Sequence, residues 1–341
     1  MELRDQALEF SEPPAPVSGG FDTRIFAFRL KGARPAGSGV GPSAAGPLIL
    51  RLLGPQHDPA RARRERAIQN AVADLGYPAP RVLWASADVR HLGGAFLVME
   101  RRAGRPLSKE RRVRAGAILA NAQLRLHALD ADRVLEALDR EGPPVHRGQV
   151  SFDAYLGRLE SLIADGALDG LRPAMRWLLE RRPPAPPRPS ICHGDFHPLN
   201  LLWDGAAVAG VLDWPNTLVG DRSFDVASTI AILALTPIEL WGIPPPLRWM
   251  VAIARPMLVR SYLAGYRRGC PLHPETLAYY EAASAMRHLV RAGQYRRRAD
   301  PSASNPLDDS SFADNLAARF ARIAGVTPAL PARRVWRRPG V

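Results

Sequence analysis

The chain has 341 residues, long enough for two modest domains or one bilobal domain, and its formal net charge is +13. Such a charge can indicate nucleic-acid binding, but nearly all basic residues are arginines spread along the chain, so we expect a solvated surface and no nucleic-acid partner. The two cysteines, Cys192 and Cys270, form no Cys-x-x-Cys pair, which excludes a zinc ribbon or a disulfide framework and favours a reducing, cytoplasmic setting.

The N-terminal part of the chain alternates between turn-rich and strand-like segments. Residues 1–16 are acidic and rich in proline, and we expect a flexible N-terminus there. Residues 17–24 have turn composition and contain Gly19-Gly20, whereas 25–30 have strand composition. A Gly-Gly turn can bring backbone N–H groups close to a phosphate, although a plain hairpin turn fits the same residues. The glycines of 31–46 are not followed by Lys-Ser/Thr, so we expect a flexible loop there and not a phosphate-binding loop.

A buried cation is predicted on the next strand, 47–53. Arg51 lies at the centre of this strand, and a buried charge needs a partner. Asp58-Pro59 is typical of a helix start, apolar residues then recur at helical spacing, and Gly76 ends the helix. Glu65 lies in the first turns of this helix. The placement of Arg51 and Glu65 resembles that of the strand cation and the helix glutamate of protein kinases, and this resemblance implies an ion pair between them, either as a structural pair or as part of a nucleotide site.

Two further strands, 81–85 and 95–100, are followed by a predominantly helical part. The most apolar run, 226–243, is interrupted by Pro237 and Glu239, and we expect a buried core helix there and not a membrane span. No apolar leader segment is visible at the N-terminus, so no membrane partner is expected. The other helices are predicted at 113–129, 152–163, 171–179, 244–266 and 275–295.

The segment Ile191–Leu202 carries the polar residues on which the functional prediction depends. Asp195 and Asn200 lie in it, with hydrophobic residues on both sides. A hairpin with a turn at Asp204-Gly205 is predicted to follow and to end at Asp213, which would bring Asp213 close to Asn200. Phosphoryl transfer needs a carboxylate that faces the attacking hydroxyl, and a second carboxylate and an amide oxygen that hold magnesium.

These motifs resemble a known family. The sequence His-Gly-Asp-x-His-Pro-x-Asn-Leu-Leu, followed by Val-Leu-Asp-Trp and Gly-Asp-x-x-x-Asp, is similar to the aminoglycoside phosphotransferase and choline kinase family of small-molecule kinases. The resemblance covers most of residues 17–230. It implies an α+β, bilobal protein-kinase-like fold, in which an antiparallel β-sheet and one main helix form the N-lobe and the C-lobe is mostly helical.

The same resemblance implies the domain boundaries. We expect a flexible N-terminus at 1–16, an N-terminal nucleotide-binding lobe at 17–99, a hinge at 100–104, a C-terminal catalytic and substrate lobe at 105–325 and a basic tail at 326–341.

The resemblance also implies the roles of individual residues. Asp195 is expected to be the catalytic base, Asn200 and Asp213 the ligands of Mg²⁺, and His193 a brace for the loop. The implied cofactors are Mg²⁺ and ATP or GTP as phosphoryl donor, and the implied partner is a small-molecule hydroxyl substrate. The residues implied in nucleotide binding are Ser18, Gly19, Gly20, Arg51, Glu65, Met99, Glu100 and Arg102.

Some positions depart from the pattern of the family. Leu199 stands where glycine is common, and Pro215-Asn216 occupy a place where an acidic residue is common. Arg51 stands where lysine is more usual, and the exchange is not neutral because the guanidinium is planar and carries five donors. Asp221 and Asp225 match the pattern, and we expect them mainly to cap and anchor the segment that follows.

The favoured function is that of an enzyme, an ATP-dependent phosphotransferase that moves the γ-phosphate to a hydroxyl of an antibiotic-like, sugar or amino-alcohol acceptor. One alternative is a non-catalytic, kinase-like nucleotide-binding protein. Another is a metal hydrolase that uses His193, Asp195 and His197, although the sequence offers no second cluster of histidine and acid. A polycationic acceptor would need an acidic pocket, and the C-terminal lobe is rich in arginine, so a macrolide-like, sugar, amino-alcohol or anionic acceptor stays open.

Overall fold

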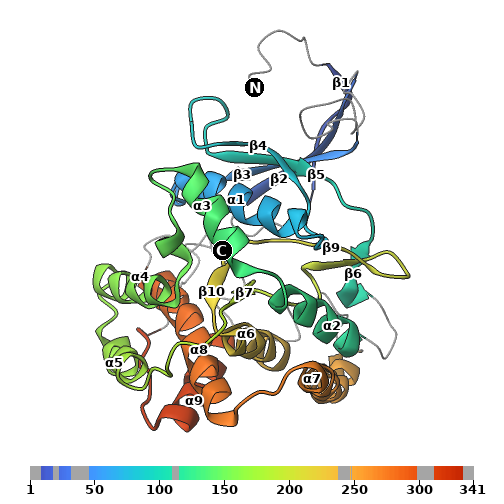
Figure 1. Cartoon of the computed structure of the whole chain (residues 1–341). Coiled ribbons are helices and arrows are strands. Elements are labelled where there is room, and N and C mark those ends of the chain that lie inside the picture. Colours follow the sequence, from blue (N-terminus) through green and yellow to red (C-terminus); the bar gives the residue numbers. More distant parts are fainter. Residues whose placement is uncertain are drawn as a thin grey trace, which may run out of the picture. The chain divides into compact units, whose positions relative to one another are not determined.

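The computed structural model describes residues 9–17, 23–31, 46–109, 115–236, 246, 248–297 and 311–332. The chain divides into two compact units. The first unit contains Met1–Glu110, Leu129–Arg147 and Pro198–Asn216, and the second contains Arg111–Ala128, Gly148–His197 and Thr217–Val341. Leu129–Arg147 and Pro198–Asn216 thus belong to the first unit although they follow the predicted hinge at 100–104. The lobe boundaries given above remain predictions. Figure 1 shows the elements of both units.

A five-stranded antiparallel sheet forms the body of the first unit (Figure 1). Helix α1, Ala60–Asp74, packs on strands β4 and β5, and α3, Ala131–Glu141, packs on α1. Because strand side chains alternate between the two faces, the sheet has one apolar cluster that includes Ala62 of α1 and another that includes Phe28 and Leu48. The strands are β1, Phe10–Pro16; β2, Thr23–Leu30; β3, Leu48–Leu53; β4, Val82–Ser86; and β5, Phe96–Glu100, in the order β1-β2-β3-β5-β4.

The predicted start and end of α1 are present. The carboxylate of Asp58 accepts the backbone N–H of Ala60 at 2.9 Å, so it satisfies one of the N–H groups that have no partner within the helix. Gly76 has φ +78°, a left-handed conformation that glycine adopts without a steric penalty, and it follows the last turn.

Two elements of the first unit correct the sequence-based expectation. Phe10–Pro16, which we expected to be part of a flexible N-terminus, is a strand paired with β2. This strand lies at the edge of the sheet. Prolines are tolerated there because no neighbouring strand on the outer side needs a hydrogen bond from their backbone nitrogen. Helix α3 was not predicted, although Asp130 caps it by accepting the N–H of Asp132 at 3.0 Å.

The predicted hairpin is confirmed in the first unit. Strands β8, Leu201–Trp203, and β9, Val208–Val211, pair in antiparallel fashion, and β6, Arg105–Pro106, pairs with β8. At the turn, the Asp204 carboxylate accepts the N–H groups of Ala206 and Ala207, both at 2.8 Å, and Gly205 has φ +108°. This local turn chemistry sets where the two ends of the hairpin lie.

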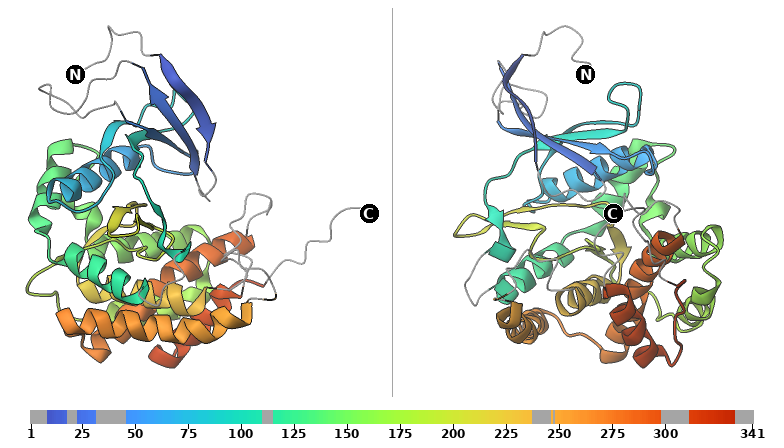
Figure 2. Two further views of the ribbon diagram at one scale, coloured as in Figure 1. Left: turned by 90° about the vertical axis from the view of Figure 1, so that its right-hand side faces the viewer. Right: turned by 180° about the vertical axis from the view of Figure 1, so that it is seen from behind.

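The second unit is mostly helical, with a two-stranded sheet of β7, Ser190–Cys192, and β10, Leu218–Gly220. Helices α6 and α8 pack together, as do α2 and α7, and Figure 2 shows the same helices from two further directions. The predicted helices are confirmed where the structure describes them, with ends that differ by a few residues in most of them; α6 begins four residues before the predicted 226, and 237–243 of its predicted range lie outside the described residues. These helices are α2, Ala115–His127; α4, Phe152–Asp165; α5, Arg172–Glu180; α6, Arg222–Leu235; α7, Arg248–Gly269; and α8, Pro274–Arg297; a further helix, α9, Phe312–Ala324, was not predicted.

The apolar run expected to be a core helix corresponds to α6, which contains nine buried residues. Pro237 and Glu239, which interrupt the run in the sequence, lie outside the described residues. Across the described ranges, none of the helices has the length and apolar character needed to span a membrane. The architecture is therefore the α+β class that was predicted, with an antiparallel sheet followed by a helical region.

Candidate functional site

The predicted ion pair between strand and helix is present in the first unit. Nη1 of Arg51 on β3 lies 3.0 Å from Oε2 of Glu65 on α1, and the Glu65 side chain is only 1% exposed. The other carboxylate oxygen, Oε1 of Glu65, accepts a hydrogen bond from Nε of Arg61 at 2.6 Å. A buried carboxylate is costly unless its lone pairs are satisfied, and here two guanidinium groups satisfy it. Glu65 is thereby fixed in position, and it fixes Arg51 in turn.

The contact between Arg61 and Glu65 should contribute to the stability of the protein. Arg61 is the second cation that pairs with Glu65, and its side chain is only 15% exposed. Replacing Arg61 with methionine is expected to lower the free energy of unfolding of the protein by about 1–3 kcal/mol, since a buried, charge-assisted hydrogen bond is lost. Urea denaturation measures this change. The control is Arg64→Met on the same helix, where Nη1 of Arg64 lies 4.0 Å from Oδ2 of the exposed Asp58, so a smaller loss is expected. Equal losses in the two variants would contradict the assignment of Arg61 as a support of Glu65.

Asp213 lies at the far end of the hairpin and also contacts Arg51. Nη2 of Arg51 is 2.8 Å from Oδ1 of Asp213, whose side chain is 40% exposed. Asp213 has φ +68°, an uncommon backbone conformation for a residue other than glycine. Such conformations persist where the surrounding structure imposes them, and they are frequent at functional sites. A single guanidinium therefore links the strand, the helix and the end of the hairpin.

Asn200 lies at the other end of the same hairpin. Its backbone carbonyl accepts the N–H of Leu212 at 2.8 Å, so Asn200 and Asp213 occupy neighbouring places at the open end of β8 and β9. One supplies an amide oxygen and the other a carboxylate, and magnesium prefers hard oxygen ligands of this kind. The residues present thus fit the predicted Mg²⁺ site, whose assignment stays a prediction.

The loop after β7, in the second unit, is held by a buried carboxylate. Oδ2 of Asp225 accepts the backbone N–H of His193 at 3.0 Å, and Oδ1 accepts that of Gly194 at 2.7 Å. Oδ2 also lies 3.0 Å from Nε2 of His127, whose Nδ1 is 2.6 Å from the hydroxyl of Tyr266. Asp225 has no exposed surface. Asp225 was expected to anchor the segment that follows it, but its carboxylate instead fixes an earlier segment, the backbone that leads into Asp195.

The surroundings of Asp225 change its pKa in two directions. Burial raises the pKa of the Asp225 carboxyl, but the hydrogen bond from His127 and the charges of His127 and His193 outweigh burial and place the pKa below its ordinary value. Asp221, four residues earlier, accepts the N–H of Ser223 at 2.7 Å as the cap of α6, as predicted.

Asp195 follows directly in the same loop. Nδ1 of His193 accepts the backbone N–H of Asp195 at 3.3 Å, so the fully buried His193 braces the loop, as expected. Oδ1 of Asp195 lies 3.7 Å from Nε2 of His197 and 3.9 Å from Nη2 of the Arg287 guanidinium. Burial raises the pKa of Asp195, but these neighbours outweigh it and lower the pKa below its ordinary value. The carboxylate is therefore ionised at neutral pH.

The remaining predicted site residues lie around the end of β5 or outside the described part. Met99 is buried and Glu100 ends the strand, where Oε2 of Glu100 lies 3.8 Å from Nη1 of Arg102. The predicted glycine turn, Ser18, Gly19 and Gly20, lies outside the described residues. The proposed hinge contacts of Met99, Glu100 and Arg102 with a nucleotide stay a prediction.

Sequence reasoning did not find Arg61, Arg287 or His288 as neighbours of the site. Arg61 is four residues before Glu65 on α1, a helical spacing that could have indicated the contact. Arg287 is far along the chain from Asp195, and no local pattern relates the two positions. His197 was considered only as a metal ligand. In the described ranges there is no group of three His, Cys, Asp or Glu side chains that could hold a metal ion, as the hydrolase alternative would need.

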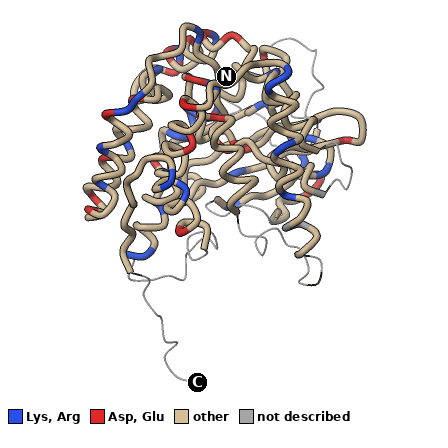
Figure 3. Tube along the Cα trace, turned by 90° about the horizontal axis from the view of Figure 1, so that it is seen from below, with Lys and Arg blue, Asp and Glu red and all other residues tan. Residues whose placement is uncertain are grey.

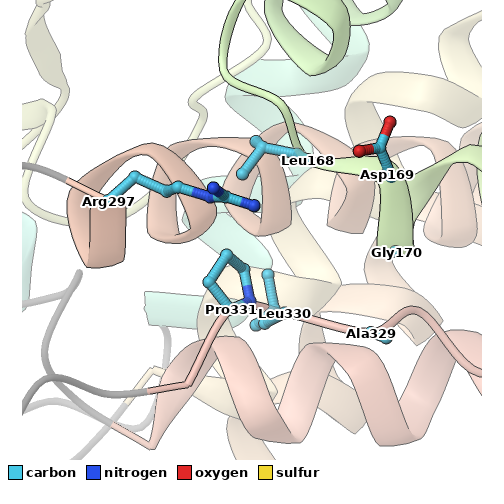
Figure 4. A pocket seen from close by; sticks show the side chains of 7 residues that line it. All are labelled: Leu168, Asp169, Gly170, Arg297, Ala329, Leu330 and Pro331. Carbon is cyan, nitrogen blue, oxygen red and sulfur yellow. The ribbon is translucent and has the colours of Figure 1, made fainter.

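A cavity of about 200 Å³ lies elsewhere in the second unit (Figure 4). It contains none of the predicted site residues. Its lining is held by hydrogen bonds between segments distant in sequence: Arg297 donates to the carbonyl of Ala167 at 2.7 Å, and the N–H of Ala329 donates to Gly170 at 3.0 Å. The cavity is small for a nucleotide, because ligand pockets usually exceed about 300 Å³. It is lined by Leu168, Asp169, Gly170, Arg297, Ala329, Leu330 and Pro331.

The first unit has an antiparallel sheet whose strand cation pairs with a helix glutamate, and the second unit is helical and holds the Asp195 loop in place. These features are those of protein-kinase-like phosphotransferases. Within this class the chain belongs to the phosphotransferase enzyme family, whose model matches residues 15–279. The protein is thus a small-molecule kinase.

Solved structures share the fold of the whole chain. A protein of Ralstonia eutropha classed as an aminoglycoside phosphotransferase is 19% identical, with a TM-score of 0.59, and the match covers 95% of this chain and 92% of that one. A macrolide 2'-phosphotransferase from Brachybacterium faecium is 16% identical, with a TM-score of 0.53 and 96% of each chain covered. An aminoglycoside phosphotransferase mutant in complex with ADP and hygromycin B is 16% identical, with a TM-score of 0.50, and covers 93% of this chain and 92% of that one.

A curated relative is much longer than the matched segment. Acyl-CoA dehydrogenase family member 11 of Gallus gallus is 30% identical over 176 residues, which is 48% of this chain but only 22% of the relative. The chain therefore spans about a fifth of that relative's length.

Proposed function

We propose that the protein transfers the γ-phosphoryl group of ATP to a hydroxyl group of a small molecule. The observation that carries the proposal is the guanidinium of Arg51, which joins Glu65 at 3.0 Å and Asp213 at 2.8 Å. In kinases a strand cation paired with a helix glutamate contacts the phosphates of the nucleotide, and a later aspartate binds the metal. The link between Arg51 and Asp213 supports the assignment of both roles within one unit.

The chemistry assigned to Asp195 follows from its charge. Its ionised carboxylate accepts a hydrogen bond from the acceptor hydroxyl and directs the oxygen toward the γ-phosphorus. As the new O–P bond forms and the bond to the oxygen that bridges the β- and γ-phosphates breaks, the hydroxyl proton passes to Asp195 and ADP leaves. A carboxylate with a lowered pKa is a weak base, so orientation of the hydroxyl is its larger contribution.

Asn200 and Asp213 are the residues that would hold Mg²⁺. The ion, when bound, neutralises charge on the phosphate oxygens. Arg51 contributes a fixed positive charge for the phosphates, and its planar group can donate to Glu65, Asp213 and an oxygen of the nucleotide in different directions. The exchange of the usual lysine for arginine thus keeps the charge and adds donors.

Binding of the nucleotide is assigned to the residues that the family resemblance indicated. Backbone groups around Met99, Glu100 and Arg102 would contact the base, and Ser18, Gly19 and Gly20 would cover the phosphates. The complex of a related fold with ADP supports an adenine nucleotide, with GTP as the alternative donor. The proposal retains the predicted nucleotide-binding and catalytic lobes and a cytoplasmic setting.

Replacing Asp213 with asparagine tests the proposal. Because a carboxylate ligand of the metal is removed, we expect the affinity of the ATP-bound protein for Mg²⁺ to fall at least about tenfold, and Mg²⁺-dependent phosphoryl transfer to fall with it. Titration calorimetry with ATP in the presence and absence of Mg²⁺ measures the first effect, and transfer of labelled phosphate to a panel of hydroxyl compounds measures the second.

The matched control is Asp204→Asn, which changes the same type of residue at the exposed turn of the same hairpin. It should leave Mg²⁺ binding unchanged. An Asp213→Asn variant with wild-type Mg²⁺ dependence would remove Asp213 from the metal site and would count against the proposed function.

A further inference from the structure

One basic side chain of α8, that of Arg287, lies next to Asp195 within the second unit. Nη2 of Arg287 is 3.9 Å from Oδ1 of Asp195, and Nε2 of His197 is 3.7 Å from the same oxygen. Arg291 follows Arg287 by one helical turn, so the two side chains lie on the same face of α8. Arg287 thus places a fixed positive charge beside Asp195, and Arg291 carries a second one on the same face of α8.

His288 gives Arg287 a defined orientation. Nη2 of Arg287 lies 3.4 Å from Nε2 of His288, and the imidazole packs edge-on against Phe312 with ring centroids 5.1 Å apart. Burial, followed by the charge of Arg287, lowers the pKa of His288 to about 3. The imidazole is therefore neutral at pH 7, and its Nε2 lone pair can accept an N–H of Arg287 without placing a further charge in the group.

The Arg287 guanidinium can bind another anion besides Asp195. A separation of 3.9 Å from the carboxylate is an ion pair, but it is longer than a hydrogen bond. The Arg287 side chain is 21% exposed, so a ligand can reach it. Guanidinium groups bind carboxylates and phosphates through paired N–H donors. An ammonium group in the same place would be repelled by the cations of α8.

We propose that Arg287, oriented by His288, is a specificity-determining residue that binds an acid group of the acceptor, a carboxylate or a phosphate. This inference rests on the proposed function, because it places the acceptor hydroxyl at Asp195. Arg287 lies within 3.9 Å of that carboxylate, so the acid group and the hydroxyl are a few bonds apart in the acceptor. The preferred acceptors are small hydroxy acids or hydroxyalkyl phosphates, and not polycationic aminoglycosides.

Acceptors that share one carbon skeleton and differ in charge test the inference. Glycerate, glycerol phosphate, glyceramide and aminopropanediol offer similar hydroxyl groups beside a carboxylate, a phosphate, a neutral amide and an ammonium group. A second series consists of hydroxybutyrate, its amide and the corresponding amino alcohol. With wild-type protein and ATP, we expect kcat/KM to be highest for an acid in each series. The comparison of glycerate with glycerol phosphate decides between the two acid groups.

Variants then assign the preference to Arg287. In Arg287→Gln we expect KM for the preferred acid to rise about 10- to 100-fold, because a hydrogen bond to a charged group is lost, and KM for the amide to rise by a clearly smaller factor. His288→Ala should raise KM for the acid by a smaller factor than Arg287→Gln does. Arg267→Gln, which removes the same charge from an exposed position on α7, is the control and should change neither constant.

Three outcomes would overturn the inference while the proposed function stands. The first is a wild-type preference for the amide or the ammonium compound. The second is an equal loss of kcat on acid and amide in Arg287→Gln, which would place Arg287 at the transferred phosphoryl group. The third is a protein that binds ATP but phosphorylates no acid of either series. A protein that does not bind ATP at all would overturn the proposed function, and this inference with it.

Discussion

Asp195→Asn is expected to lower kcat for phosphoryl transfer about 10²- to 10⁴-fold, the usual contribution of a positioned general base. Asparagine has the shape of aspartate, but its neutral amide orients the hydroxyl more weakly than an ionised carboxylate does and cannot take the proton. The backbone hydrogen bond from Asp195 to His193 does not depend on the side chain, so the loop should keep its conformation. Steady-state kinetics measures kcat, and titration with ATP should give an unchanged affinity.

The pH dependence of the wild-type protein follows from the charges around Asp195. Since the pKa of Asp195 lies below its ordinary value of about 3.9, the carboxylate stays ionised from neutral pH down to about pH 4. Loss of activity above pH 4 must then come from another group.

The control for Asp195→Asn is Asp132→Asn at an exposed position of α3, which should retain wild-type kcat. A wild-type kcat in Asp195→Asn would show that the carboxylate has no role in catalysis.

Features set by neighbours in sequence were predictable from the sequence. The hairpin at Asp204-Gly205 was found because its turn is made by local hydrogen bonds and a left-handed glycine, which depend on those residues alone. The start of α1 at Asp58 was found for the same reason. The pairing of Arg51 with Glu65 was expected because a cation in a buried strand needs a partner, and the resemblance to kinases indicated the glutamate of the next helix.

Features set by distant contacts were not predictable from the sequence. Strand β1 contains prolines, which indicate a flexible segment until an edge position beside β2 is known. The neighbours of Asp195 on α8 lie about ninety residues away, and an arginine on a helix gives no sign of which loop it faces. His127 and Asp225 are likewise joined only in the folded second unit. The overall distribution of charge did not indicate the site, because basic and acidic residues are scattered over the described part of the trace (Figure 3).

Asp225→Asn is expected to lower the free energy of unfolding by about 3–5 kcal/mol, because a buried carboxylate that three hydrogen-bond partners contact is replaced. Asp225 uses both oxygens to accept backbone N–H groups, from His193 and Gly194, and one of them also contacts His127. In asparagine one oxygen becomes an NH₂ group, which cannot accept and which would face another donor. A buried N–H is left without a partner, and the loop that carries Asp195 loses its anchor. Urea denaturation measures the stability, and kcat should also fall.

The effect of Asp225→Asn depends on pH in a direction that its pKa fixes. The folded-state pKa of Asp225 lies below its unfolded-state value of about 3.9, so its ionised form stabilises the folded protein above that value. This contribution is lost as the pH falls through the folded-state pKa. The difference between wild type and variant should therefore be full at pH 7 and shrink below about pH 4. Asp221→Asn is the control, because asparagine is also a good helix cap and a change below about 1 kcal/mol is expected. A loss that is equal in both variants, or constant with pH, would mean that Asp225 acts only as a polar residue and not through its charge.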